Sequence, residues 1–142
     1  MSEKYWVVEV PRGEVLKVAV TSFGYLHGAP PKAHLVVDVR DCLHNPANGR
    51  AMRELTGLYP QVREHVLATP GATDVLASLL STVRTLHRLH DPRRLKVLVA
   101  IGCAGGRHRS VVLANELMRT LNRQGIATEV EHRDVARPVV TR

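Results

Sequence analysis

Short apolar runs alternate along the chain with longer segments in which apolar residues recur at helical spacing. Three runs rich in β-branched residues predict buried strands at residues 15–22, 35–39 and 97–101. Residues 5–10 predict a further strand, and a hairpin with 15–22 is one alternative for this opening stretch. Strict alternation over 128–134 predicts a half-exposed strand near a sheet edge.

Helical spacing predicts three helices, at residues 60–67, 70–90 and 111–121. Thr69 has the side chain of an N-cap and precedes a proline suited to the first helical turn, so we expect the second helix to begin there. Gly125 is suited to cap the C-terminus of the third helix. The buried face of the second helix is predicted to carry Val75, Leu76, Leu79, Leu80, Val83 and Leu86.

Strands that alternate with helices predict an α/β fold, a layered and mostly parallel sheet of about four to five strands flanked by helices. The 142 residues fit a single domain, with 1–14 as an N-terminal extension or strand and 135–142 as a basic tail. Residues 41–58 are broken by Asn-Pro, Asn-Gly and a further glycine, which predicts a long ordered loop. A loop of this length in a compact domain is often functional.

The formal charge of +7, from 20 Lys and Arg against 13 Asp and Glu, favours anionic partners such as nucleic acid, nucleotides or phosphorylated metabolites. A solvated basic surface explains the same charge equally well. The candidate RNA contacts are arginines near the end of the chain, Arg123, Arg133, Arg137 and Arg142. The aromatic content of 4% is too low for a stacking platform of the kind that single-strand RNA binders use.

The apolar runs are far too short to span a bilayer, and the opening residues lack the pattern of a signal peptide. Two cysteines, Cys42 and Cys103, do not make a disulfide framework. We therefore expect a cytoplasmic protein with free thiols and no membrane partner.

The segment 101–110 joins a buried strand to a helix through a glycine-rich loop, which predicts an anion site. Gly105 and Gly106 let the backbone curl around a phosphate, and the first turn of the helix offers unpaired N–H groups. Arg109 can add a planar, two-pronged contact. The candidate ligand residues are Ala104, Gly105, Gly106, Arg107, His108, Arg109 and Ser110. The alternative to an anion site is a tight structural connection between the strand and the helix. Ser110 can likewise act only as the N-cap of the helix.

Polar clusters also follow two other predicted strands, and ligands in α/β folds gather at the carboxyl ends of strands. Ser22 and Gly24 end one strand, while Asp38 and Arg40 end another. The segment 132–134 is a fourth polar cluster at the carboxyl end of a predicted strand. Asp38 can either pair with Arg40 or accept hydrogen bonds from a ligand hydroxyl or amine.

Cys103 and Arg109 are six positions apart and a serine follows, a C-x5-R-S spacing that resembles the phosphate loop of cysteine-dependent phosphatases. The resemblance implies Cys103 as a nucleophile and Arg109 as the holder of the oxyanions. Gly102 stands where such phosphatases usually place a histidine, and no aspartate has the pattern of a general acid. Phosphatase activity is therefore kept as an alternative to simple binding.

The wider set of motifs resembles the C-terminal domain of the RapZ/YvcJ family, nucleotide-binding RNase adapters. The matching pieces are Ser22-Phe23-Gly24 with His27-Gly28, Val37-Asp38-Val39-Arg40, Glu54-Leu55-Thr56-Gly57-Leu58, the 101–110 loop and Val130-Glu131-His132-Arg133-Asp134. The resemblance implies sensing of an amino-sugar phosphate and binding of small RNA. The chain has no G-x-x-x-x-G-K-[ST] segment, so ATP hydrolysis is not carried over.

These observations favour a domain that binds a phosphorylated small molecule, either a sugar phosphate or a nucleotide. An RNA-binding adapter module remains a further alternative. His87 and His90 lie one helical turn apart without further ligands at suitable spacing, so we predict no metal site and no cofactor. The sequence leaves both a monomer and a homo-oligomer open.

Overall fold

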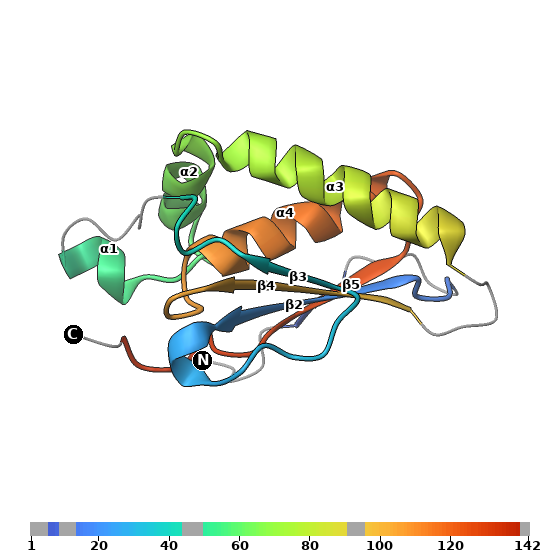
Figure 1. Ribbon diagram of the computed structural model, residues 1–142. Coiled ribbons are helices and arrows are strands. Elements are labelled where there is room, and N and C mark those ends of the chain that lie inside the picture. The colour runs from blue at the N-terminus through green and yellow to red at the C-terminus, as the bar shows by residue number, and fades with distance from the viewer. Residues whose placement is uncertain (1–5, 9–13, 44–49, 91–95, 140–142) are drawn as a thin grey trace.

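The computed structural model describes residues 6–8, 14–43, 50–90 and 96–139, which form one sheet with helices packed on it (Figure 1). The strands are β1 (Trp6–Val8), β2 (Val18–Gly24), β3 (Leu35–Asp38), β4 (Val97–Cys103) and β5 (Thr128–His132). The helices are α1 (Arg50–Glu54), α2 (Pro60–Ala68), α3 (Ala72–Leu89) and α4 (Arg109–Arg123), with a 3-10 turn, η1, at Tyr25–His27.

The sheet has the order β1-β5-β2-β4-β3, and β2, β3, β4 and β5 run parallel to one another. This arrangement confirms the predicted α/β fold with a mostly parallel sheet. The strand β1 pairs antiparallel with β5, so that Trp6 lies opposite Glu131. The alternative of a hairpin between the first two strands is therefore wrong, because β5 lies between β1 and β2.

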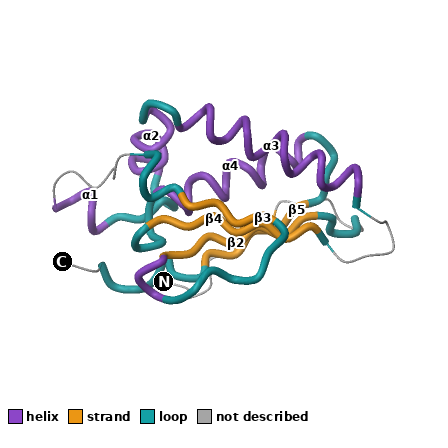
Figure 2. The backbone as a smooth tube through the Cα atoms, in the orientation of Figure 1, coloured by secondary structure: helices purple, strands orange, loops and turns teal. Residues whose placement is uncertain are grey.

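The helices α2, α3 and α4 lie over one face of the sheet, and η1 lies on the other side (Figure 2). Alternate strand residues face the helices, because side chains alternate between the two faces of a strand. The core between the layers is made of apolar residues from both, among them Val20, Val99, Ile101, Val130, Leu79, Val83, Leu113 and Leu117. On the opposite face Val36 is 43% exposed and Leu98 is 37% exposed.

The start of α3 differs from the sequence prediction, although its apolar face packs on the core as expected. Thr69 ends α2 instead of capping α3, and its hydroxyl donates to the carbonyl of His65 (3.0 Å). The N-cap of α3 is Gly71, which has a left-handed backbone conformation with φ of 90°. A threonine and a proline suit either side of a helix boundary, and the glycine decides where the chain turns.

The helix α4 runs back over β2, β4 and β5 and begins directly after the loop that leaves β4. Gly125 follows it with φ of 82°, as expected of a C-terminal cap. The predicted long loop at 41–58 contains the short helix α1, while residues 44–49 lie outside the described part of the chain.

Among the described residues no single helix is long and apolar enough to cross a membrane. Only the pair α2 and α3, taken together and bent by 91°, has the length and composition of a membrane span.

Candidate functional site at the carboxyl edge of the sheet

The loop between β4 and α4 is seated on the end of β2. A Cβ atom on Gly24 would lie 2.4 Å from the carbonyl carbon of Gly105, so only glycine fits at this position. Gly106 has φ of 73°, and a Cβ there would lie 2.6 Å from the backbone nitrogen of Gly24. The close approach of the two backbones therefore requires glycine on both sides. The N–H of Gly24 donates to Oδ2 of Asp134 (2.8 Å), which ties in the segment after β5.

The backbone N–H groups of residues 105–108 donate no hydrogen bond within the described ranges. They precede the first turn of α4, whose N-cap is His108 and whose side chain makes no capping bond. Unpaired N–H groups and the positive end of a helix dipole lie together here, and both favour a bound anion.

Cys103 and Ser110 lie at the base of the loop and are both buried. The Sγ of Cys103 and the Oγ of Ser110 are 3.1 Å apart. Ser110 is inside α4 and is not its N-cap, so the alternative role of Ser110 as a cap is wrong.

The guanidinium of Arg109 is turned toward backbone carbonyls. Its NH1 lies 2.8 Å from the carbonyl oxygen of Leu43, 3.1 Å from that of Arg40 and 3.5 Å from that of Val39. The residue is only 6% exposed. Arg109 therefore fastens the segment that follows β3 to the start of α4.

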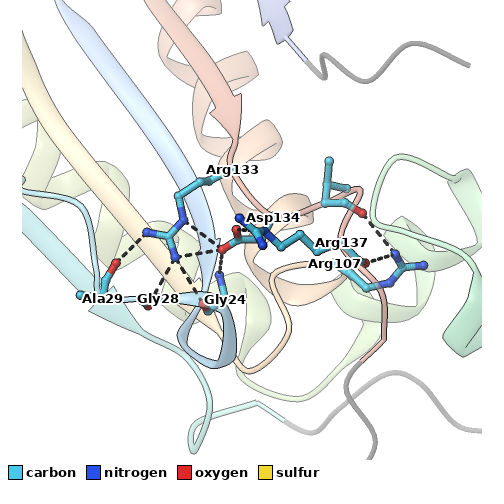
Figure 3. Close-up of polar contacts among 8 residues, drawn as sticks. Gly24, Gly28, Ala29, Arg107, Arg133, Asp134 and Arg137 are labelled. Carbon is cyan, nitrogen blue, oxygen red and sulfur yellow. Dashed lines mark hydrogen bonds and ion pairs between the residues drawn. The ribbon is translucent and has the colours of Figure 1, made fainter.

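Arg107 connects its own loop to two other segments of the chain, and Figure 3 shows its contacts with the segment after β5. Its NH1 donates to the carbonyls of Arg137 (2.8 Å) and Val135 (3.3 Å), and its NH2 donates to the carbonyl of Glu54 (3.0 Å). Its own carbonyl accepts a hydrogen bond from the N–H of Gly57 (2.7 Å). The loop is thus held between the 54–57 segment and the 135–137 segment.

His108 adds a second attachment to the same stretch of chain. Its Nε2 lies 2.7 Å from the carbonyl oxygen of Leu55, so Nε2 donates. Burial lowers the pKa of His108, and the nearby charge of Arg107 acts in the same direction. The neutral imidazole is therefore favoured at neutral pH.

Asp134 is the buried carboxylate at the centre of an arginine cluster (Figure 3). Arg133 donates to Oδ2 of Asp134 through Nε (3.0 Å), and its NH1 donates to the carbonyl of Ala29 (2.6 Å). The Nε of Arg137 lies 3.3 Å from Oδ1 of Asp134. Two guanidinium groups therefore contact one carboxylate, which leaves a net positive charge beside the loop.

Ser22, near the end of β2, and His132, the last residue of β5, contact each other inside the protein. The Oγ of Ser22 lies 2.6 Å from Nδ1 of His132, and Nε2 of His132 lies 2.9 Å from Oδ1 of Asn115. An amide oxygen only accepts, so Nε2 carries the proton and Nδ1 accepts from the hydroxyl of Ser22. Burial lowers the pKa of His132 to about 4, with a smaller contribution from Arg119.

Asp38 and Arg40 pair with each other, which was one of the two alternatives. The NH2 of Arg40 lies 2.7 Å from Oδ2 of Asp38, and its Nε lies 3.0 Å from Oδ1. The same guanidinium lies 3.7 Å from the centre of the Tyr25 ring. Hydrogen bonding to Arg40 holds the pKa of Asp38 below its usual value.

The comparisons with known proteins agree with this arrangement of motifs. A family model described as the RapZ C-terminal domain matches residues 16–136 of the chain. The chain belongs to the RapZ C-terminal domain family. Nucleotide-binding proteins of Frankia casuarinae, Gloeobacter violaceus and Streptomyces coelicolor are similar to it, at 41%, 42% and 42% identity over 128, 122 and 125 residues.

These matches cover 89%, 85% and 86% of this chain but only 44%, 40% and 41% of the three relatives. The chain therefore spans less than half the length of the curated relatives that it matches. These relatives are more than twice as long as the region that matches this chain.

The arginines proposed as RNA contacts do not all lie together in this RapZ C-terminal domain. Arg133 and Arg137 follow β5 at the carboxyl edge. Arg123 ends α4 and donates to Oγ1 of Thr120, at the end of the helix from which the chain enters β5. It therefore lies at the opposite edge of the sheet. Arg142 lies outside the described residues.

The sequence reasoning missed Asn115 and Gly57. Asn115 is a buried polar residue within an apolar stretch of α4. A polar residue on the apolar face of a predicted helix could have indicated its buried hydrogen bond. A Cβ on Gly57 would lie 2.8 Å from the carbonyl oxygen of His108, which explains a glycine in the long loop. In the described part of the chain no three His, Cys, Asp or Glu residues gather into a metal site.

Proposed function

We propose that this domain binds a phosphorylated small molecule at the loop between β4 and α4. The observation that carries the proposal is the row of backbone N–H groups at residues 105–108, which donate to none of the described residues and lie immediately before the N-terminus of α4. The phosphate lies against these N–H groups, where the helix dipole also favours negative charge.

The charges around the loop support an anionic ligand. The guanidinium groups of Arg107 and Arg109 are bound to carbonyl oxygens, which are neutral, so both keep their full positive charge beside the loop. They contribute by their electrostatic field and by holding the loop in shape, and the phosphate contacts come from the backbone. This division of roles differs from a direct two-pronged contact by Arg109.

The end of the neighbouring strand β3 supplies polar groups for the uncharged part of the ligand. Asp38 and Arg40 are exposed at the end of β3, and the carbonyl of Arg40 is bonded to Arg109. A carboxylate accepts hydrogen bonds from hydroxyl or amine groups, which suits a sugar phosphate. The relatives are named nucleotide-binding proteins, so a nucleotide is the competing ligand. As part of this proposal we place the domain in the cytoplasm.

The proposal is tested at Gly105, where an added Cβ meets no atom within 4 Å. The variant Gly105→Glu brings a negative charge to the loop, and Gly105→Gln is the matched neutral control. Thermal unfolding is measured with inorganic phosphate, a hexose phosphate, a nucleoside monophosphate and an unphosphorylated hexose. A ligand at a hundredfold excess over its Kd stabilises the folded state by about 2.7 kcal/mol.

We expect phosphate-bearing ligands to raise the melting temperature of the wild type and of Gly105→Gln, and to have no effect on Gly105→Glu. The hexose phosphate is expected to act at lower concentration than inorganic phosphate. If no phosphate-bearing compound stabilises the wild type, or if Gly105→Glu responds as strongly as Gly105→Gln, the proposal is wrong.

A cysteine-dependent phosphatase is the second candidate, and the contact between Cys103 and Ser110 supports it. A hydroxyl 3.1 Å from the sulfur can donate to a thiolate and stabilise it. The orientation of Arg109 argues against it, since a guanidinium bonded to the carbonyl of Leu43 is not placed over a phosphoryl group in the loop.

A further inference from the structure

The strand β3 forms one edge of the sheet, and an apolar hollow of about 390 Å³ lies between this strand and α3. We call it the β3–α3 hollow. Leu35 and Val37 line it from the strand, and Val75 and Leu79 line it from the helix. Its volume lies in the range of ligand sites. None of its lining residues belongs to the loop between β4 and α4.

The backbone of β3 has hydrogen-bonding groups that point away from the sheet. The N–H of Val39, directly after the strand, donates to the carbonyl of Gly102 on β4 (2.9 Å). Because successive residues of a strand direct their N–H groups to opposite sides, Val37 also faces β4, whereas Val36 and Asp38 face the free edge. Neither of these two N–H groups donates to a described residue outside the sheet. Such an edge is a template for a further strand.

The free edge and the hollow lie next to each other. Side chains alternate between the two faces of a strand, so a strand added beside Val36 would place every second side chain on the face of Leu35 and Val37, at the hollow. Backbone hydrogen bonds combined with pockets for alternate side chains are the features of peptide recognition by strand addition. The outward groups of β3 recur about every 6.6 Å, a spacing that an extended chain matches.

Two observations favour a peptide of another protein over a second copy of this chain. In a second copy, Leu35 and Val37 pack on their own core and cannot enter the hollow of the first. Asp74 is the one charged side chain among the described residues that line the hollow, and it makes no ion pair with a described residue. A lysine or arginine in the docked segment complements this carboxylate.

We propose that β3 and the β3–α3 hollow bind an extended peptide segment of another protein, with apolar residues at alternate positions and a basic residue at one end. The peptide adds a strand beside β3, and its carbonyl oxygens accept hydrogen bonds from the N–H groups of Val36 and Asp38. Its alternate apolar side chains enter the hollow, and its basic residue lies beside Asp74. The proposal does not rest on phosphate binding, because no residue of the loop takes part.

The test uses a capped peptide of alternating valine and threonine that ends in lysine. Amide hydrogen exchange of the protein, followed by NMR, is the reporter. At saturating peptide we expect exchange at Val36 and Asp38 to slow at least about tenfold, and exchange at Val37 to stay unchanged because its N–H already faces β4. If the peptide does not bind at about 1 mM, or binds without slowing these two amides, the proposal is wrong.

Two modified peptides test whether the backbone carries the binding. One is N-methylated at every valine and the other at every threonine, so that each loses the backbone donors of one edge and keeps all its side chains. We expect only one of the two to bind, because only one edge of the added strand meets β3. Binding of both would overturn the strand addition. If exchange at Val36 slows with protein concentration alone, the occupant is a second copy and the assignment to a peptide is wrong.

Variants of the protein assign the edge. Val36→Pro removes an outward N–H, and proline is tolerated in edge strands where this group faces solvent. The Val36 side chain is 43% exposed and points away from the hollow, so Val36→Thr is the matched control that keeps the donor. We expect Val36→Pro to raise the Kd for the peptide at least about tenfold and Val36→Thr to leave it unchanged. Equal affinities of the two variants would contradict the proposal.

Variants of α3 assign the hollow without altering the strand. Ser78→Trp fills the hollow from an exposed position and should abolish binding, whereas Ser81→Trp, exposed on the same helix outside the hollow, should not. Asp74→Asn should raise the Kd about threefold for the lysine peptide and leave it unchanged for the same peptide ending in glutamine. If Ser78→Trp binds the peptide as well as Ser81→Trp does, the hollow takes no side chain and the proposal is wrong.

Discussion

The hydroxyl of Ser22 lies 2.6 Å from Nδ1 of His132, a residue 110 positions later in the sequence. The two residues lie near the carboxyl ends of parallel neighbouring strands, and Ser22 lies directly opposite His132 in their register. Because Nε2 of the same imidazole is bonded to Asn115 on α4, the contact joins the sheet to the helix layer. A proton added to His132 would remove its ability to accept from Ser22.

The first prediction follows from the pKa of His132, which burial lowers to about 4 from a usual 6.5. Between these values the unfolded chain binds more protons than the folded one, so stability falls as the pH drops from about 6.5 toward 4. We expect a loss of about 2.5 kcal/mol between pH 7.5 and 4.5 from this group. Urea unfolding across this range measures it. His132→Gln should flatten the slope, and an unchanged slope in that variant would contradict the assignment.

The second prediction concerns the stability contributed by Arg109. Truncation to alanine removes the buried guanidinium that donates hydrogen bonds to the carbonyls of Arg40 and Leu43. We expect Arg109→Ala to lower the free energy of unfolding by about 3 kcal/mol without any ligand present. Arg88→Ala, an exposed arginine on α3, is the matched control. Denaturant unfolding checks it, and a loss below that of the control would mean that the carbonyl contacts are unimportant.

The third prediction compares two adjacent glycines. Gly106→Ala places a Cβ 2.6 Å from the nitrogen of Gly24 at a φ of 73°, so we expect it to destabilise the fold by at least about 2 kcal/mol. Gly105→Ala meets nothing within 4 Å and should change stability by less than about 0.5 kcal/mol. Equal effects of the two substitutions would contradict the loop geometry described above.

The fourth prediction separates binding from catalysis at Cys103. Because Arg109 is bonded to carbonyl groups, we expect no hydrolysis of a generic aryl phosphate beyond that of Cys103→Ser. The serine variant keeps the size of the side chain and its contact with Ser110 while removing the thiolate. Wild-type hydrolysis that disappears in Cys103→Ser would establish the phosphatase alternative.

The fifth prediction concerns RNA. Arg137 lies at the carboxyl edge of the sheet and its side chain is 58% exposed, while Arg123 lies at the opposite edge. If structured RNA binds at the carboxyl edge, Arg137→Ala should lower the salt slope of the affinity by about one contact, and Arg123→Ala should not change it. Gel shifts over a salt series measure both. An equal effect of the two variants would indicate diffuse attraction to a basic surface.

The sequence predicted the layers of this fold because its buried elements have strong patterns. The run Val97–Ile101 and the spacing of Leu79 and Val83 lead directly to β4 and α3. The β1 pairing could not be predicted, since a short apolar strand carries no information about its partner. The boundary at Gly71 was missed because Thr69 and the proline after it suit a helix start equally well.

The sequence predicted that the polar segments after the strands lie at one edge of the sheet, but it did not predict the contacts among them. Glycines at positions 105 and 106 and the polar strand exits led to the carboxyl edge, which follows from parallel strands alone. The direction of Arg107 and Arg109 was not accessible, because a guanidinium satisfies its donors equally well on a ligand oxygen or on a carbonyl. Only the positions of distant segments decide between them.

The three carbonyls that Arg107 holds belong to residues 54, 135 and 137, so we expect this contact to form late in folding. Contacts of such long sequence separation form slowly, because the intervening chain must first be closed. During synthesis on the ribosome, the strands β2, β3 and β4 can emerge and meet before residue 137 exists. The loop between β4 and α4 then lacks one of its supports, so we expect it to reach its described conformation only after the segment beyond β5 has left the ribosome and docked.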